Sequence, residues 1–462
     1  MKTKYTRVDV LYFVTLVVTV AAGGSVALGM LGDEELLSFL SEYDFSLPSL
    51  DAGLGLGLSP LAALLLVWRT WLVWRYRAVP PCADRALPLT TVIIPAYNEG
   101  RQVLETVRSV MASDYPAAKM QVICIDDGSK DDTWQWMRLA AAEFPKRLQL
   151  LRQPCNMGKR HALLAGFRES TGEVFVTIDS DSLILPDTLR QLVSPLVVSA
   201  KVGAVAGNVR VLNINDGPIP KMLDVNFTMC FDFLRRGQSA YGGVFCTPGA
   251  LSAYRRSALA PEMEAWAVQT FMGRPANIGE DRALSNIILG QGLDVVFQKD
   301  AIVLTTIPSA YPALHKMFLR WARSNVRECL VMALFLPRRF RTGRGANWVR
   351  LSGILELVFL PATETVKVAF LIGLCLRPMT SLNLLATGCV LAALLPALVY
   401  QFRQHGLFGI VWALAYSIYW TTALSWISLW GLFTAAKSGW LTRECPSTQA
   451  ASLALEETAN AA

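Results

Sequence analysis

The stretch Gly172-Glu-Val-Phe-Val-Thr-Ile-Asp-Ser-Asp-Ser182 decides the fold. Its apolar, β-branched run from Val174 to Ile178 predicts a buried strand, and Asp179-Ser-Asp181 follows where that strand ends. Open α/β sheets bind their ligands at the carboxyl ends of the strands. Two carboxylates at i and i+2 can share one divalent cation there, and hard oxygen ligands suit Mg²⁺ or Mn²⁺. A solvated turn is the alternative interpretation, and other parts of the chain decide between the two.

The composition indicates a membrane protein. The chain has 462 residues, of which 53% are hydrophobic and 17% are charged, and its mean hydropathy is +0.37. That is too apolar for an ordinary soluble enzyme, and the length allows more than one domain. The net charge of +7 includes arginine clusters beside apolar runs, at 69–77 and 338–344, which are typical of cytoplasmic membrane flanks rather than of a nucleic-acid surface. The nine cysteines form no CxxC pair, so we expect neither disulfides nor a zinc site.

Two uncharged runs precede the soluble part of the chain. Val10–Leu31 is long enough to cross a bilayer, and basic residues before it and acidic residues after it place the N-terminus inside. We interpret it as an uncleaved anchor rather than a signal peptide, because it is longer than a typical signal core. Ala52–Trp68 ends in aromatic and basic residues and returns the chain to the cytoplasm. Residues 1–77 are therefore expected to form two transmembrane helices.

Three apolar stretches lie near the C-terminus, and we expect residues 346–443 to form a transmembrane and re-entrant region. Glu364 and Lys367 interrupt the first stretch, Ser352–Leu376, and can pair at a spacing of i and i+3. Ionisable residues at the depth of a span usually face a cavity, so we expect this helix to line a polymer channel. The alternative is that Pro361 divides an interfacial helix from a shorter span.

The last two apolar stretches determine the topology. Pro378–Phe402 predicts a clean span, whereas Gly406–Ala436 is uncharged over 31 residues, which is too long for one straight crossing and short for two. Basic residues precede and follow this last stretch, which favours the cytoplasm for both of its ends. We therefore expect it to dip into the bilayer and return, or to lie at the interface. The tail at 444–462 is expected to be flexible.

Between the membrane regions, short apolar runs alternate with helical patterns, which predicts an α/β domain with a mostly parallel sheet and helices on both faces. Strands are predicted at 91–94, 122–125, 148–151 and 174–178, and helices at 101–111, 132–142 and 161–169. Because the polar loops all follow strands, we expect one cleft to be shared by Asp126, Asp127, Lys159, Asp179 and Asp181. Neither a GxGxxG nor a P-loop fingerprint is present, so dinucleotide and P-loop chemistry are not indicated.

Several short motifs stand in a specific order: Pro95-Ala-Tyr-Asn-Glu99, Asp126-Asp-Gly-Ser129, Gly158-Lys-Arg160, Asp179-Ser-Asp181, Gly279-Glu-Asp-Arg282 and Arg320-Trp321. This order resembles that of family 2 inverting glycosyltransferases, in particular the membrane-embedded processive branch of hyaluronan, chitin and nodulation chitooligosaccharide synthases. The resemblance covers roughly residues 91–443. It implies a GT-A-type cytoplasmic domain at 88–308, fused through amphipathic interfacial helices at 309–345 to an α-helical transmembrane domain.

The resemblance also implies a nucleotide and metal site. The nucleotide contacts would be Pro95, Tyr97, Glu99, Asp126, Asp127, Lys159, Arg160, Asp179 and Arg443. Asp181, with Asp179, would hold Mg²⁺ or Mn²⁺ against the departing UDP. Asp126 and Asp127 have a structural alternative, because aspartates at these positions also suit a helix cap and a turn. A basic start to the helix at Lys159 opposes the helix dipole, which favours a ligand there.

The remaining implied roles concern catalysis and the acceptor. Asp281 would be the general base that an inverting transfer needs, with Glu280 beside it. Arg320, Trp321 and Trp440 would contact the acceptor, although Trp321 also suits a membrane-interface anchor. The chain departs from the family at Met317, where the motif has a glutamine, and methionine is only a weak hydrogen-bond acceptor.

We therefore expect a processive, UDP-sugar-dependent transferase that extends a β-linked polysaccharide and exports it across the plasma (inner) membrane, with its catalytic domain and C-terminus cytoplasmic. The resemblance favours N-acetylglucosamine as a donor sugar, with or without glucuronate. The expected partners are the UDP-sugar, the growing polysaccharide and the bilayer, and no nucleic acid. Two alternatives stay open: a non-processive transferase acting on a lipid acceptor, and a transporter or scaffold with a degenerate transferase domain.

Overall fold

The computed structural model describes residues 6–32, 64–337, 345–376, 378–404 and 408–437. Within them, eight strands form one mixed sheet in the order β3-β2-β1-β4-β7-β6-β10-β5. The strands are β1 Thr90–Ala96, β2 Met120–Asp126, β3 Leu148–Arg152, β4 Val174–Ile178, β5 Ser182–Ile184, β6 Val202–Val211, β7 Leu251–Arg255 and β10 Asp294–Thr305. The first four run parallel, β7 is antiparallel to both of its neighbours, and β10 is parallel to β6 and antiparallel to β5. The four strands predicted from sequence are all present.

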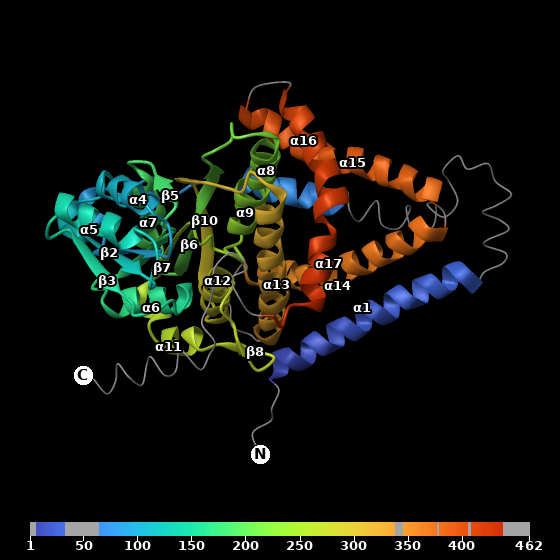
Figure 1. The fold of residues 1–462 in the computed structure, drawn as a ribbon, viewed down its shortest axis with the longest axis horizontal. Coiled ribbons are helices and arrows are strands. Elements are labelled where there is room, and N and C mark those ends of the chain that lie inside the picture. Colours follow the sequence, from blue (N-terminus) through green and yellow to red (C-terminus); the bar gives the residue numbers. More distant parts are fainter. Residues whose placement is uncertain (1–5, 33–63, 338–344, 377, 405–407, 438–462) are drawn as a thin grey trace, which may run out of the picture.

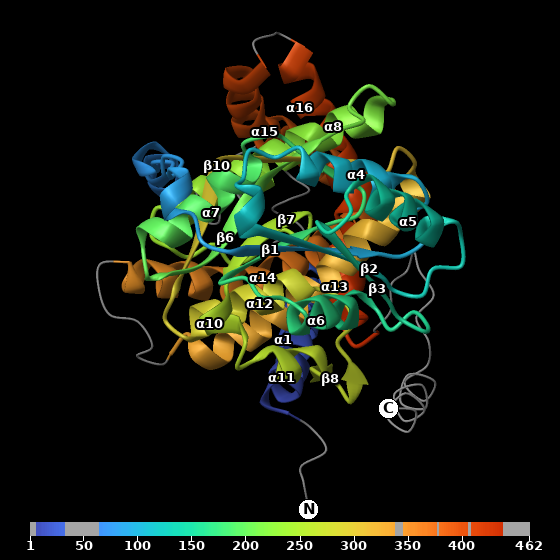
Figure 2. The same cartoon turned by 90° about the vertical axis from the view of Figure 1, so that its left-hand side faces the viewer.

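Helices cover both faces of this sheet, as the sequence predicts (Figures 1 and 2). One face carries α4 (Gln102–Met111), α5 (Thr133–Glu143) and α7 (Thr188–Val198), whose apolar side chains share one core cluster. The other face carries α6 (Lys159–Arg168), α10 (Arg256–Leu259), α11 (Met263–Ala267) and α12 (Glu280–Gly290), which share a second cluster. This two-sided burial explains why the central strands are apolar at almost every position.

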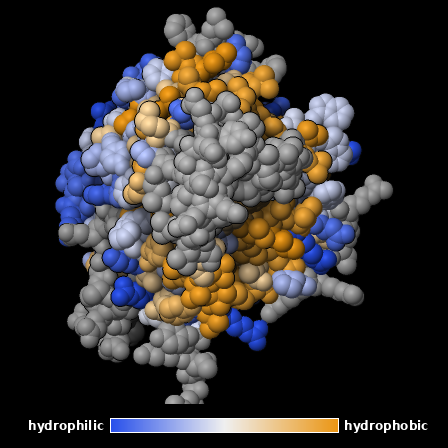
Figure 3. Space-filling view, turned by 90° about the vertical axis from the view of Figure 1, so that its right-hand side faces the viewer, coloured by the Kyte–Doolittle hydropathy of each residue, from blue (hydrophilic) through white to orange (hydrophobic). Residues whose placement is uncertain are grey.

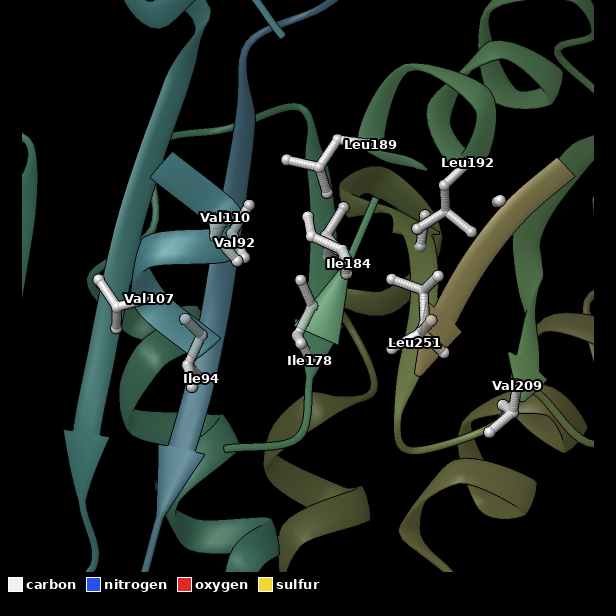
Figure 4. Packing of buried hydrophobic residues seen from close by; sticks show 14 of the residues in the cluster. Val92, Ile94, Val107, Val110, Ile178, Ile184, Leu189, Leu192, Val209 and Leu251 are labelled. Atoms are coloured by element: carbon white, nitrogen blue, oxygen red, sulfur yellow. The ribbon is translucent and has the colours of Figure 1, made fainter. Parts of the chain in front are cut away.

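Alternation along β1 shows how the two cores are built. Val92 and Ile94 pack with Val107 and Val110 of α4, whereas Ile93 between them belongs to the opposite cluster (Figure 4). Successive side chains of a strand point to opposite faces, so each core receives every second residue. All of these side chains are fully buried. The rigid sheet holds the strand ends, and therefore the polar loops, in fixed positions.

Long apolar helices pack beside this domain (Figure 1). They are α1 (Arg7–Gly32), α13 (Tyr311–Phe335), α14 (Ala346–Leu376), α15 (Pro378–Gln404), α16 (Phe408–Tyr419) and α17 (Trp426–Phe433), with a π-helix at Trp420–Leu424 joining the last two. Among the described residues, three segments are long and apolar enough to cross a membrane: Ala346–Cys375, Ser381–Gln401 and Gly409–Phe433. Exposed apolar side chains of these segments and of α1 contribute to the orange surface in Figure 3.

The membrane-region predictions meet the structure in part. Helix α1 covers the first predicted span, but residues 33–63, which hold most of the second, lie outside the described residues. Helix α14 runs unbroken through Pro361, so that proline does not divide it. The predicted pair is confirmed, since Lys367 Nζ donates to Glu364 Oε1 at 2.8 Å. Trp440, Arg443 and the predicted flexible tail also lie outside the described residues.

The remaining elements connect these parts. A helix at 64–75 precedes the first strand, and α8 (Pro218–Phe227), a π-helix (Thr228–Phe233) and α9 (Leu234–Ser239) form one nearly continuous helical segment between β6 and β7. Short 3₁₀ turns lie at Asp84–Ala86 and Ala117–Lys119, and β8 (Thr270–Phe271) pairs with β9 (Arg274–Pro275). The β8–β9 hairpin packs on α1, where Tyr12 contacts Phe271 edge-on and Asp9 accepts a hydrogen bond from the backbone N of Met272.

Candidate active site

A cavity of about 900 Å³ lies at the carboxyl-end edge of the sheet. Its lining comes from the ends of β1 and β4, the loop after β2, the starts of α6 and α12, and one side of α13. The α8–α9 segment and the segment from the second π-helix to α17 close it on the membrane side. Of the predicted site residues, those that line it are Pro95, Tyr97, Glu99, Asp127, Lys159, Asp179, Asp181, Glu280, Asp281, Arg320 and Trp321.

The turn after β2 divides its two aspartates between different tasks. Asp126 is fully buried and accepts hydrogen bonds from the backbone N of Ser129 at 2.9 Å and from Arg152 Nε at 3.1 Å, so it shapes the turn. Asp127 lines the cavity and accepts from the backbone N of Met157 and of Gly158, both at 2.9 Å. It therefore holds the loop that leads into α6, and the structural alternative for Asp126 fits its contacts.

Lys159 stands at the centre of the charged part of the site. Its Nζ donates to Asp179 Oδ1 at 2.5 Å and lies 3.1 Å from Glu280 Oε1. Burial by itself lowers the pKa of Lys159, but the two carboxylates raise it above its usual value, so the ammonium is permanently charged. Gly249 makes this packing possible, because a Cβ there would lie 2.8 Å from Nζ.

Arg160 points away from the cavity that its neighbour lines. Its side chain is buried, and Nη1 donates to the carbonyl of Trp266 at 2.8 Å and to Gln269 Oε1 at 2.9 Å. The guanidinium also lies over the Trp266 ring, 5.2 Å from its centroid. These contacts tie α6 to α11 and to the segment after it, so the structure places Arg160 in a different environment from the diphosphate site that the sequence predicts.

The start of α12 positions two adjacent carboxylates. Gly279 adopts a left-handed conformation with φ of 70°, and a Cβ there would lie 2.4 Å from Ser324 Cβ, so only glycine fits. Glu280 then reaches Lys159. Asp281 also lines the cavity, and its Oδ1 accepts from the backbone N of Arg282 at 2.7 Å.

The pKa values of these two carboxylates are shifted in opposite directions. Burial raises the pKa of Glu280, but Lys159, a backbone hydrogen bond and the charge of Arg320 together outweigh burial and lower that pKa to about 2. Burial and the neighbouring Glu280 charge raise the pKa of Asp281, and Lys159 only partly offsets them. Pairs of titratable groups whose pKa values are pushed apart mark acid–base assignments. Glu280 is thus a fixed anion, whereas Asp281 has the higher proton affinity that a general base requires.

The loop after β4 can hold a divalent cation. Asp179 and Asp181 both line the cavity, with Asp179 bonded to Lys159 and Asp181 Oδ1 accepting from Ser182 Oγ at 3.2 Å. Among the described residues, no three histidine, cysteine or acidic side chains converge on one point. Mg²⁺ and Mn²⁺ sites in phosphoryl chemistry commonly use one or two carboxylates completed by substrate phosphates, and this donor set fits that pattern.

Aromatic rings form the wall of the cavity towards the membrane. Trp321 meets Phe318 edge-on at 5.4 Å and Phe231 edge-on at 6.2 Å, and Phe227 lies 6.3 Å away, so the indole is fixed in orientation. Phe318 also meets Trp420 of the second π-helix at 5.5 Å. Arg320 and Met317 line the same wall. Such fixed rings can stack on the apolar face of a sugar.

Several lining residues escaped the sequence prediction, chiefly Asn226, Phe231, Arg235, Cys246, Trp420 and Ser428. A spacing of four residues between Phe227, Phe231 and Arg235 was the available signal, since it indicates one helical face. Trp420 and Ser428 gave no such signal. Both lie in an apolar stretch, one at the start of a π-helix and the other after it.

Comparisons with known proteins identify a family and related sequences. Residues 88–324 match the family model described as "Glycosyltransferase like family 2". The N-acetylglucosaminyltransferase of Rhizobium meliloti is 34% identical over 252 residues, covering 54% of this chain and 59% of that protein. That of Sinorhizobium fredii is 32% identical over 260 residues, covering 56% and 63% respectively. The aligned region thus spans about three fifths of the length of these curated relatives.

A solved structure shares the fold. The mannosyltransferase PcManGT from Pyrobaculum calidifontis, in complex with GDP-Man and Mn²⁺, superposes with a TM-score of 0.56 and 24% sequence identity. The match covers 80% of this chain and 98% of that one. It agrees with the GT-A-like mixed sheet predicted from sequence.

Proposed function

This chain belongs to glycosyltransferase-like family 2, and we propose that it transfers N-acetylglucosamine from its UDP-activated form to a hydroxyl of a growing β-linked oligosaccharide. The observation that carries the proposal is the pair Glu280–Asp281, whose proton affinities are pushed apart at the edge of the cavity. Support for this sugar comes from the relatives, which are named N-acetylglucosaminyltransferases.

In this proposal the nucleotide lies along the sheet edge. Tyr97 and Glu99 hold the uridine beside Asp127, and Lys159 contacts the diphosphate. Asp181, with Asp179, holds Mg²⁺ or Mn²⁺, which when bound would neutralise charge on the departing UDP. Lys159 then has two anionic partners in the free enzyme, Asp179 and Glu280, that keep it in place for the diphosphate.

The transfer is a single displacement. Asp281 removes the proton of the acceptor hydroxyl while the hydroxyl oxygen attacks the anomeric carbon, and the bond from that carbon to the diphosphate oxygen breaks. UDP leaves, the configuration inverts, and the proton remains on Asp281. Glu280 is unsuited to this role, because Lys159, a backbone hydrogen bond and Arg320 together lower its pKa to about 2, which leaves it too weakly basic.

Processive extension and export complete the proposal. The cavity continues from the base along α13 to Trp420 and Ser428, beside helices that are apolar enough to span a membrane. An oligosaccharide stacked on Trp321 would therefore point towards the membrane helices. We place the protein in the plasma (inner) membrane as a multi-pass enzyme, with its catalytic domain in the cytoplasm. A non-processive enzyme with a lipid acceptor would instead release a product longer by one sugar.

The test is UDP release by the purified chain in detergent, measured against UDP-sugars supplied singly and in pairs. We expect release with UDP-N-acetylglucosamine, loss of release in EDTA, and product chains of many sugars on a gel. A strict need for two donors would indicate a heteropolymer. Absence of release with every donor would contradict the proposal and favour a degenerate domain.

A further inference from the structure

Arg235 lines the cavity but has no part in the mechanism above. It belongs to α9, directly after the π-helix at Thr228–Phe233, and its side chain is only 7% exposed. Its guanidinium lies over the Phe231 ring, 4.6 Å from the centroid. Among the described residues, Nη1 has no hydrogen-bond partner, although it is buried.

A buried guanidinium with an unused N–H is costly. Leaving a buried donor unsatisfied costs about 1–3 kcal/mol, and more for a charged group. Burial also lowers the pKa of Arg235, which shows that its surroundings disfavour the charge. The neighbouring Arg236 differs, since its Nη2 donates to Asp232 Oδ2 at 2.7 Å and it does not line the cavity. Of these two adjacent arginines, only Arg235 lines the cavity and has a buried N–H without a hydrogen-bond partner among the described residues.

The surroundings of Arg235 place it on the acceptor side of the general base. Cys246 contributes to the electrostatic environment of Arg235, and its Sγ donates to Asp281 Oδ2 at 3.7 Å. The Phe231 ring, over which the Arg235 guanidinium lies, also contacts the Trp321 ring. The diphosphate, by contrast, is proposed to bind at Lys159. The ion-pair partners of Lys159 are Asp179 and Glu280.

Resting on the proposed function, we infer that Arg235 binds the acceptor sugar by donating from Nη1 to the carbonyl oxygen of its N-acetyl group. An amide carbonyl is the strongest neutral hydrogen-bond acceptor on such a sugar. The ring of Phe231 fixes the plane of the guanidinium, so the donor direction is set before the sugar arrives. Arg235 would then determine specificity, because a sugar without the acetyl group leaves the buried donor unpaired.

The experiment compares acceptors with and without N-acetyl groups. UDP release by the full chain is measured with UDP-N-acetylglucosamine and either a β-1,4-linked N-acetylglucosamine tetramer or the matching glucose tetramer. We expect Arg235→Met to raise the KM of the N-acetylated tetramer about 10- to 100-fold, the loss expected for a hydrogen bond to a charged group. The KM of the glucose tetramer and the affinity for UDP should not change, and intact UDP binding shows that the variant is folded.

Two further variants separate the possible outcomes. Arg236→Met is the matched control and should keep the wild-type preference between the two acceptors. Arg235→Lys keeps the charge but loses the planar fork, so it should recover only part of the preference. Unchanged discrimination in Arg235→Met overturns the inference, as does a rise confined to the KM of UDP-N-acetylglucosamine. A shift of the acid limb of the pH profile with unchanged acceptor KM would also overturn it. If the wild type releases no UDP, the proposed function itself fails.

Discussion

Two adjacent carboxylates at the start of α12 have different surroundings. Glu280 faces Lys159 and is stabilised as an anion, whereas Asp281 gains proton affinity from burial and from Glu280. One position along a helix is enough to separate them, because side chains at i and i+1 point in different directions. The groups that act on Asp281 include the side chains of Glu280, Lys159, Arg235 and Cys246, together with the backbone N–H of Arg282.

Opposite pKa shifts predict opposite changes in stability. The folded-state pKa of Asp281 is raised, so its ionised form destabilises the fold at neutral pH, and Asp281→Asn should raise the midpoint of thermal unfolding. The pKa of Glu280 falls from 4.5 to about 2, so its contribution is present above the unfolded value and is lost as the pH falls through about 2. Glu280→Gln should therefore lower the midpoint at pH 7. Equal shifts in both variants would contradict these environments.

For single residues, the sequence predicted which loops lie together but not the direction of every side chain. Asp127, Lys159, Asp179 and Asp181 reach one cavity because they follow neighbouring parallel strands, a rule that needs only topology. Arg160 could not be placed in this way. Its partner carbonyl belongs to Trp266, 106 residues further along the chain, and no local pattern indicates that contact.

A buried ion pair within α13 helps to join that helix to α12. Arg327 Nε lies 2.8 Å from Glu328 Oε1, and Arg327 also donates to the carbonyl of Ile278, just before the base-bearing helix. Asn286 of α12 donates to the Glu328 carbonyl at 2.9 Å and to its Oε2 at 3.1 Å. The pair thus links the helix that carries Asp281, the proposed base, to the helix that carries Trp321.

Breaking this pair should destabilise the protein strongly. Glu328→Ala leaves the buried Arg327 guanidinium without its counter-charge, and we expect a loss of about 3–5 kcal/mol of unfolding free energy. Denaturant or thermal unfolding in detergent measures it. The control is Glu264→Ala, which breaks an exposed pair with Arg168 and should leave the unfolding midpoint nearly unchanged. Similar behaviour of the two variants would show that the buried pair has no special weight.

The aromatic wall on α13 predicts a variant that separates binding from elongation. Trp321→Ala should leave the affinity for UDP nearly unchanged, because the indole contacts Phe318 and Phe231 rather than the nucleotide loops. Elongation should fall, since the stacking surface for the acceptor is lost. Gel analysis of product length and a UDP-binding titration measure the two effects. Products of normal length would exclude this role.

Strands and helices were predictable from the sequence where their apolar residues recur at a regular spacing. The four parallel strands and the helices between them follow apolar runs and helical spacing, and the long helix α13 follows its amphipathic pattern. The two π-helices were not predictable, because one extra residue per turn depends on how neighbouring helices pack. They bring Phe231 and Trp420 to the cavity, so the membrane-side wall was missed with them.

In the whole molecule, polar contacts join the membrane helices to the active site. Arg282, next to the base, donates from Nη2 to Glu356 Oε2 of α14 at 2.7 Å. Further along α14, Glu364 Oε1 accepts from Lys367 Nζ and from Ser428 Oγ of α17, and Ser428 lines the cavity. The ionisable residues that interrupt the first apolar stretch therefore have partners on the catalytic side and at the membrane end of the cavity.

The topology gives a prediction for the whole chain. Basic residues on both sides of the last apolar stretch favour the cytoplasm, although Gly409–Phe433 has the length and composition of a crossing. A cysteine at position 446, with Cys375 and Cys445 replaced, should not react with an impermeant thiol reagent added outside intact cells. A cysteine at position 377, between the two preceding spans, should react and serves as the control. Labelling at position 446 from outside would refute the cytoplasmic C-terminus.

The most direct test of the whole account is the activity of Asp281→Asn beside its affinity for UDP. Asparagine keeps the shape and the contact with the backbone N of Arg282 but cannot accept the acceptor proton. We expect UDP release from UDP-N-acetylglucosamine to fall by at least about 100-fold. The affinity for UDP should stay close to that of the wild type, and the exposed variant Asp300→Asn should remain fully active. Near-normal release by Asp281→Asn would contradict the assignment of the base and with it the proposed mechanism.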